Sequence, residues 1–264
     1  ATENLVIIEL TVEGDVPDNN PYARNNLVGV DVNLWTTTGN EAETATGNLA
    51  DGYWATRKIA TTTESIALDR TSCQWSSEAA VAMRLFNHRE PGLPWFRMDG
   101  WAGDRFVISP THSTFIVASV VTSEESETPL AVARQNIAAM TLERIEELRA
   151  AHHEWWREFW SKSFVDIGDP VIERYYYGSN YLLACCSRNI EFAPGLYGNW
   201  ITADGPAWQG DYHLNYNHEA PWWGVCSSNH VELADPYDSP ILDNLPTAIE
   251  NAKNYLGIRG AYCD

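Results

Sequence analysis

Apolar and polar residues alternate over much of the first half of the chain. In residues 28–34, Val28, Val30, Val32 and Leu34 occupy every second position, which is the pattern of a strand with one buried face. Further β-rich runs occupy residues 5–12, 65–68, 81–86, 106–109 and 114–121, and turn-forming clusters separate them. The pattern predicts an antiparallel β-sandwich in residues 1–128.

The hydrophobic period changes after the polar segment 122–128. Apolar residues then recur at helical spacing, at Ile137, Met140, Ile145, Leu148, Trp155 and Phe159. This spacing predicts one long or two shorter helices over residues 130–160, within a helical linker at 129–168.

Helix signals continue to the last residues of the sequence. Asp169-Pro170 is an N-cap followed by proline at the first helical position, which predicts a helix to about residue 188. A third helix is expected at residues 221–233, and a fourth from Ser239-Pro240 to Gly257. Residues 169–264 are therefore predicted to be helical hairpins, and the fold class is α+β with more than one domain.

The net charge of the chain argues against two classes of binding partner. The 264 residues include 17 Lys and Arg against 36 Asp and Glu, a formal net charge of −19. Such a surface repels phosphate backbones and anionic lipid, so neither nucleic acid nor a membrane surface is an expected partner. The sequence also holds no apolar run of the roughly 20 residues that a membrane helix needs.

The cysteines indicate neither a metal site nor a disulfide framework. No pair has the Cys-x-x-Cys spacing, and buried free thiols are the expectation for these five residues: Cys73, Cys185, Cys186, Cys226 and Cys263. We expect no metal and no cofactor.

The segment between the first two predicted hairpin helices concentrates unusual side chains. Residues 193–223 hold several tryptophans together with spaced asparagines, two histidines and several carboxylates. Tryptophan supplies flat apolar surface, while amides, imidazoles and carboxylates can read hydroxyl positions, so the combination indicates a sugar or polyol pocket. The alternative is a buried polar network that only fixes the loop between helices.

The same segment carries spaced elements that resemble a known family. They are Pro194-Gly195-Leu196-x-Gly198-x-Trp200, Pro206-x-Trp208 and Asp211-Tyr212-His213-Leu214-Asn215-Tyr216-Asn217, followed by Glu219. They resemble the active-site stretch of glycoside hydrolase family ninety-five, the inverting α-L-fucosidases and related α-L-galactosidases of the six-hairpin glycosidase group. The resemblance implies a β-sandwich, linker helices and an (α/α)6 barrel, here its first hairpins at residues 169–264.

The resemblance also implies roles for individual residues. Asn215 and Asn217 would position the attacking water, and His213 would contact the sugar. The further substrate-binding candidates are Trp200, Trp208, Asp211 and Glu219. A neutral amide can orient water while a carboxylate accepts the proton, and inversion needs two carboxyl groups ~6.5–9.5 Å apart. In the family those carboxylates come later in the chain, so we expect them beyond Asp264.

The sequence departs from the family after Glu219. The family usually continues Met-Asn-Tyr-Trp-Pro, whereas this chain has Ala220-Pro221-Trp222-Trp223-Gly224, so the substrate could differ. Twelve barrel helices need at least ~200 residues, but 95 remain from Pro170 onward. We therefore expect an incomplete barrel whose exposed helical face is covered by the rest of a longer enzyme, a separate chain or another copy.

These observations predict part of a glycoside hydrolase that acts on an α-linked deoxy sugar or a galactose-like glycoside with inversion. The isolated chain is expected to be inactive, and the family's polymeric substrates suggest an extracellular or periplasmic location. One alternative is a non-catalytic carbohydrate-binding or assembly module. Another uses Asp211 and Glu219 within the chain as the acid and base pair.

Overall fold

The computed structural model describes residues 4–14, 28–36, 42–59, 77–88, 101–108, 111–199, 207–210 and 212–262. The chain divides into two compact units, Ala1–Ala150 and Ala151–Asp264, here called the first and second unit. The division into a sandwich, a linker and a partial barrel at residues 1–128, 129–168 and 169–264 stays a prediction.

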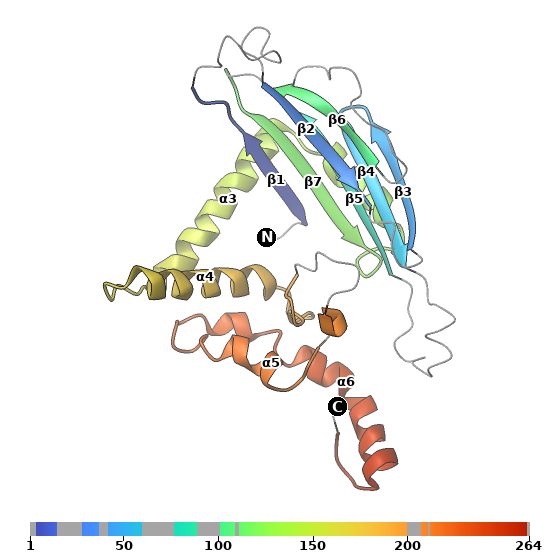
Figure 1. Cartoon of the computed structure of the whole chain (residues 1–264), viewed down its shortest axis with the longest axis vertical. Coiled ribbons are helices and arrows are strands. Elements are labelled where there is room, and N and C mark those ends of the chain that lie inside the picture. Colours follow the sequence, from blue (N-terminus) through green and yellow to red (C-terminus); the bar gives the residue numbers. More distant parts are fainter. Residues whose placement is uncertain are drawn as a thin grey trace. The chain divides into compact units, whose positions relative to one another are not determined.

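The first unit contains two antiparallel sheets (Figure 1). The larger has the order β1-β7-β5-β4-β3, formed by Leu5–Leu10, Thr114–Thr122, Ser77–Phe86, Gly52–Ile59 and Ala42–Leu49. The smaller pairs β2 (Val28–Trp35) with β6 (Trp101–Ile108). Each described pairing is antiparallel, which agrees with the alternation seen in the sequence.

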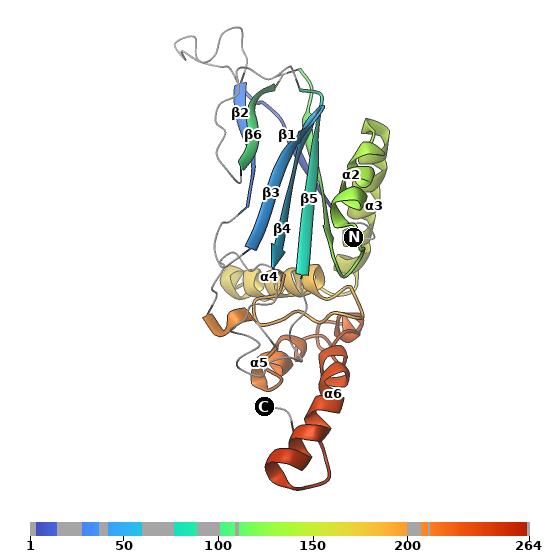
Figure 2. The ribbon, with the colours of Figure 1, turned by 90° about the vertical axis from the view of Figure 1, so that its right-hand side faces the viewer.

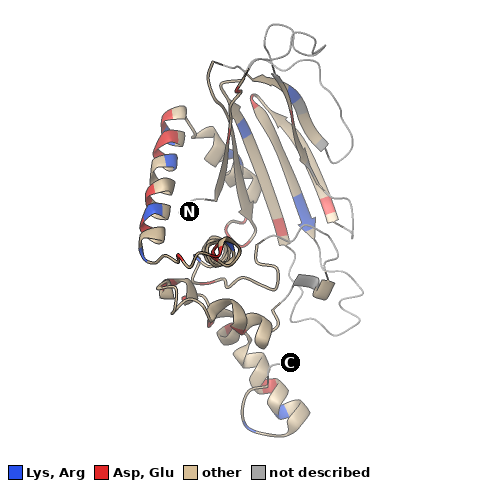
Figure 3. Ribbon diagram, turned by 60° about the vertical axis from the view of Figure 1, so that its left-hand side comes forward, with Lys and Arg blue, Asp and Glu red and all other residues tan. Residues whose placement is uncertain are grey.

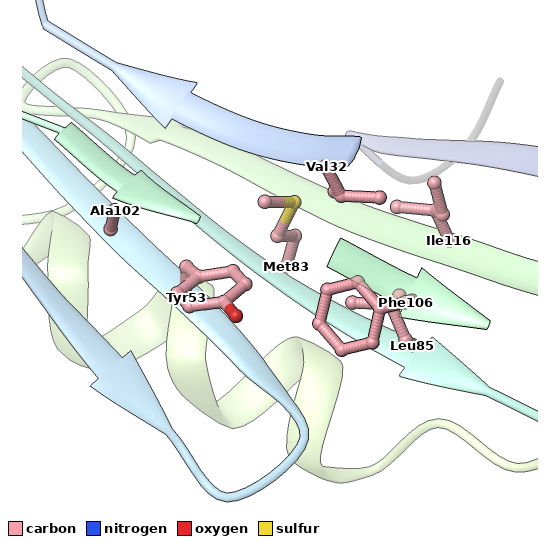
Figure 4. Packing of buried hydrophobic residues seen from close by; sticks show 7 residues of the cluster. All are labelled: Val32, Tyr53, Met83, Leu85, Ala102, Phe106 and Ile116. Atoms are coloured by element: carbon pink, nitrogen blue, oxygen red, sulfur yellow. The ribbon is translucent and has the colours of Figure 1, made fainter. Parts of the chain in front are cut away.

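Alternation along β5 divides its side chains between two cores. Met83 and Leu85 point to the β2-β6 side, where they pack with Val32, Tyr53, Ala102, Phe106 and Ile116 (Figure 4). Ala80 and Ala82 point to the other side and pack against α2 (Pro129–Ala138). Because residues two apart share a face, one strand serves both cores.

The helical layer lies on the opposite face of the large sheet from β2 and β6 (Figure 2). There α2 and the first part of α3 (Leu142–Ser161) cover the sheet. The side-chain amide of Asn136 donates to the hydroxyl of the fully buried Ser119 at 3.1 Å. Arg149 pairs with Glu9 at 2.8 Å. Acidic and basic residues are interspersed along α3 (Figure 3), and several form pairs three residues apart.

The second unit is helical in its described residues. It contains the rest of α3, α4 (Pro170–Cys186), η2 (Ala207–Gly210), α5 (Tyr216–Glu219), η3 (Ala220–Trp222), η4 (Val231–Ala234), α6 (Ser239–Asn251) and the π-helical turn η5 (Ala252–Leu256). Its core consists of Phe159, Ala184, Ala193, Trp222, Val225 and Leu233. Half-buried tryptophans of α3 pack around this core, and they are Trp155, Trp156 and Trp160.

Several predicted elements are confirmed. The helical pattern at 130–160 is two helices, α2 and α3, and Asp169 caps α4 by accepting hydrogen bonds from the backbone N–H groups of Val171 and Ile172. The last helix closes at Gly257, which has a φ of +64°. Three cysteines within the described part of the chain are free thiols as expected, but the prediction that they are buried is wrong: Cys185 and Cys186 are half-buried and Cys226 is exposed. The run at 65–68 lies outside the described residues.

The structure differs from the predicted helices and strands at three points. The helix expected at 221–233 is instead two short 3-10 helices with turns between them, because Asn229 has a φ of +57° and cannot continue a right-handed helix. Strands β3 and β4 were not predicted, since their sequences mix small and polar residues. Ser239 is the first residue of α6 and does not cap it: its hydroxyl donates to the carbonyl of Pro236 at 2.9 Å.

The antiparallel sheets and helices confirm an α+β fold, and the incomplete (α/α)6 barrel at residues 169–264 stays a prediction. No helix in the described ranges is both long enough and apolar enough to cross a membrane.

Candidate functional site

The short helix α5 carries the two asparagines that the sequence singled out. Asn215 is its N-cap, and the side-chain oxygen of Asn215 accepts a hydrogen bond from the backbone N–H of Asn217 at 3.4 Å. The Asn215 carbonyl also accepts from the backbone of His218 at 2.9 Å and of Glu219 at 3.1 Å. The cap therefore fixes where α5 begins and which way its side chains point.

One face of the α5–η3 segment is anchored in the core. His218 and Trp222, four residues apart, are both buried. The His218 ring stacks on Tyr237 with centroids 4.8 Å apart and planes 18° apart. The His218 Nε2 lies 2.9 Å from the Tyr237 carbonyl oxygen, and since a carbonyl only accepts, Nε2 donates. This anchor holds α5 in place.

The opposite sides of the segment are exposed and polar or aromatic. Asn215, Asn217 and Glu219 are exposed. They offer amide donors, amide oxygens and one carboxylate within five residues, which is a chemistry suited to hydroxyl groups and to water. His213 precedes them, and its carbonyl accepts from the backbone N–H of His218 at 3.2 Å. Within the chain, α5 thus separates an apolar anchor from a polar surface.

Two tyrosines tie the segment before α5 to the loop that follows α4. The Tyr212 hydroxyl donates to the Ala193 carbonyl at 2.5 Å, and the Tyr197 hydroxyl donates to the Ala207 carbonyl at 2.9 Å. Partial burial, together with the Asp243 carboxylate, raises the pKa of the Tyr212 phenol. Tyr212 therefore keeps its proton at neutral pH and remains a donor.

A second anchor lies beneath the turns after η3. The buried His230 ring stacks on Phe159 of α3, with centroids 3.8 Å apart and planes 6° apart. Burial lowers the pKa of His230, although the neighbouring Glu232 carboxylate acts in the opposite direction. Lys162 pairs with Glu232, and the Ser163 hydroxyl donates to the Ser228 carbonyl at 2.6 Å. These contacts join the end of α3 to residues 228–232.

The structure brings together only some of the predicted site residues. Asn215, Asn217 and Glu219 lie on or next to α5, and His213 lies three residues before its first residue. Trp208 lies on η2 with 69% of its surface exposed. The other two candidates, Trp200 and Asp211, lie outside the described residues. The roles assigned to all seven residues stay predictions.

The sequence analysis did not predict that the side chains of His218 and Trp222 are buried. The signal was present, because residues four apart on a helix share a face and Tyr216, Asn217 and Glu219 take the other sides. Within the described ranges, no group of three or more histidine, cysteine, aspartate or glutamate side chains is arranged to hold a metal ion.

Comparisons with known proteins place this segment in a family context. Residues 136–264 match the family described as "Glycosyl hydrolase family 95 catalytic domain". The chain is 34% identical over 98 residues to the probable alpha-fucosidase A of Aspergillus niger and 32% identical over 96 residues to that of Aspergillus oryzae. The aligned parts are 36% and 35% of this chain, but only 12% and 13% of those proteins. The chain thus matches about an eighth of the length of these relatives.

Proposed function

Since residues 136–264 belong to the glycosyl hydrolase family 95 catalytic domain, we propose that this chain forms one wall of the active site of a glycoside hydrolase. Membership of that family confirms the resemblance seen in residues 194–219. We propose that the substrate carries an α-linked L-fucose or a galactose-like sugar. Support comes from the names of the two Aspergillus relatives and from the concentration of tryptophan and amide side chains in residues 193–223.

The observation that carries this proposal is the two-sided character of α5. Its His218 and Trp222 face is buried, while Asn215 and Asn217 are exposed at its start. An anchored helix end holds polar groups at fixed positions, which is what a site that orders water needs. The side-chain oxygen of Asn215 already accepts the capping hydrogen bond from the backbone of Asn217. In the proposal, the side-chain amide of Asn217 and the side-chain NH2 group of Asn215 orient the attacking water.

The proposed reaction is a single displacement with inversion. One carboxylate accepts the proton of the attacking water while a carboxylic acid protonates the leaving oxygen, so that the glycosidic bond breaks as the new C–O bond forms. We propose that both carboxyl groups come from other parts of the enzyme. Most of the length of the curated relatives lies outside the aligned segment, which is compatible with this arrangement.

The remaining predicted residues would bind the substrate. In the proposal, His213 and Glu219 contact sugar hydroxyls, Asp211 supports the same loop, and Trp200 and Trp208 offer flat apolar surface to sugar rings. The exposed Trp208 ring on η2 agrees with such a role.

Exposed apolar side chains on two helices support an incomplete barrel. Val171, Tyr175 and Leu182 of α4 and Leu242 and Ile249 of α6 are each more than half exposed. Exposed apolar surface of this extent marks a contact face. We propose that further barrel helices cover it, whether from the rest of the enzyme, a separate chain or another copy. An extracellular or periplasmic location stays a prediction.

Hydrolysis of 4-nitrophenyl α-L-fucoside and α-L-galactoside tests the proposed function. The full gene product that contains this chain should cleave at least one of them, and proton NMR should show the inverted anomer as the first product. Asn217→Ala should abolish most of the turnover, whereas Asn254→Ala, at another exposed asparagine, should not. The isolated chain should be inactive. Turnover by the isolated chain, or sugar binding without hydrolysis by the full gene product, would contradict the proposal, and the latter would favour a binding module.

A further inference from the structure

Two large aromatic side chains project from the exposed surface of the α5–η3 segment. Tyr216 and Trp223 are 64% and 63% exposed. Their ring centroids lie 5.3 Å apart and their planes meet at 81°. Tyr216 begins α5 and Trp223 follows the 3-10 helix η3, and the contact between their rings places them side by side on the surface. Together they form an aromatic corner, with one ring standing at nearly a right angle to the other.

Packing in the hydrophobic core does not account for the presence of Tyr216 and Trp223. Within the same eight residues, His218 and Trp222 already supply the buried aromatic contacts with Tyr237. Burial of a large aromatic side chain stabilises a fold in proportion to the apolar area removed from water, and a ring that is nearly two-thirds exposed gains only a small part of that stabilisation. Tyrosine and tryptophan are rigid, with one apolar face and one polar atom each, which suits a surface that binds a partly apolar, partly hydroxylated ligand.

We propose that the Tyr216–Trp223 corner binds the pyranose ring of the sugar unit next to the one held at Asn215 and Asn217. This assignment rests on the proposed function, because it takes the asparagines as the site of the cleaved sugar. A pyranose ring presents C–H groups on its faces and hydroxyls at its rim. One aromatic ring of the corner lies against a face of the sugar ring, and the other aromatic ring lies along the edge of the sugar ring.

Helix geometry favours a neighbouring sugar over the cleaved one. Consecutive residues on a helix point about 100° apart, so Asn217 faces a different direction from Tyr216. A single ring seated at Asn217 would therefore not also lie flat in the corner. Glu219 is exposed three residues after Tyr216 in the same helix, and in the proposal its carboxylate accepts hydrogen bonds from sugar hydroxyls.

Calorimetric titration of this chain with two probes tests the inference. The probes are L-fucose and 2′-fucosyllactose, a trisaccharide with one α-linked L-fucose. We expect the trisaccharide to bind about tenfold more tightly than L-fucose, because it also fills the corner. Trp223→Ala and Tyr216→Ala should each remove most of that tenfold gain and leave the affinity for L-fucose within about twofold.

Controls separate stacking from a general disturbance of the fold. Trp223→Phe retains a flat ring and should recover most of the trisaccharide affinity. Tyr255→Ala removes an aromatic ring of similar exposure, 74%, from η5 and should change neither affinity. Circular dichroism should be the same for all variants, since both corner residues are mainly exposed.

The outcomes distinguish this inference from the proposed function. If the chain binds both probes but neither alanine variant weakens the trisaccharide, the corner is not a sugar subsite, and the proposed function stands. Equal losses for both probes would overturn the assignment to the neighbouring sugar. If the unaltered chain binds neither probe, the inference is wrong, whereas the proposed function is decided separately, by hydrolysis of the two aryl glycosides.

Discussion

Replacing His218 with alanine should strongly destabilise the second unit. The imidazole is 5% exposed, stacks on Tyr237 and contacts the rings of Trp222 and Tyr212 edge to face. Its loss leaves the Tyr237 carbonyl without the donor at 2.9 Å, which costs about 1–3 kcal/mol. The cavity left by the ring adds about 2 kcal/mol or more. The expected total is about 3–5 kcal/mol of the free energy of unfolding.

Urea denaturation followed by tryptophan fluorescence measures this effect. The urea concentration at the midpoint of the second unit's unfolding transition should fall, and the dependence of the free energy of unfolding on urea concentration should change little. Asn217→Ala, one residue away but exposed, is the matched control and should alter the free energy of unfolding by less than about 0.5 kcal/mol. A loss below about 1 kcal/mol for His218→Ala would refute the conclusion that this ring anchors α5.

Three further predictions concern catalysis, pH and the sheet. In the full gene product, Asn217→Ala should lower kcat for the aryl fucoside by about 10²-fold or more, measured from initial rates. Because burial lowers the pKa of His230, the unfolded chain binds a proton there that the folded chain does not, so stability should fall as the pH drops below about 6.5. In thermal unfolding between about pH 7 and 5, the stability of His230→Phe should decrease less with falling pH than that of the unaltered chain. An equal decrease would contradict the assignment of this pH dependence to His230. In β4, Gly52→Ala would place a Cβ 2.0 Å from the Met83 carbonyl oxygen, so it should cost more than about 2 kcal/mol by urea denaturation, and a neutral result would show that the strands can separate.

Local signals in the sequence were sufficient where a segment interacts mainly with one neighbouring layer. The alternation in residues 28–34 gave β2, because this strand buries one face against the larger sheet. Asp169-Pro170 gave the start of α4, because capping needs only a side-chain oxygen and two nearby N–H groups. The resemblance to glycoside hydrolase family 95 rests on spaced motifs in residues 194–219, which can be recognised in the sequence without tertiary contacts.

Other features depend on contacts distant in sequence and could not be read from local patterns. Strands β3 and β4 are stabilised by pairing with each other and with β5, although their own hydrophobic pattern is weak. The inward position of His218 depends on Tyr237, nineteen residues later. The sequence predicts one helix at residues 221–233, but the positive φ of Asn229 breaks it, and Trp222, Val225 and Leu233 meet in one core.

The central claim is that the exposed start of α5 holds the sugar that the enzyme cleaves. A crystal structure of this chain soaked with L-fucose tests that claim most directly. The account predicts one fucose with hydroxyl oxygens within about 3.2 Å of the side-chain amides of Asn215 or Asn217. Fucose bound away from α5, or an empty α5 surface at saturating fucose, would contradict it.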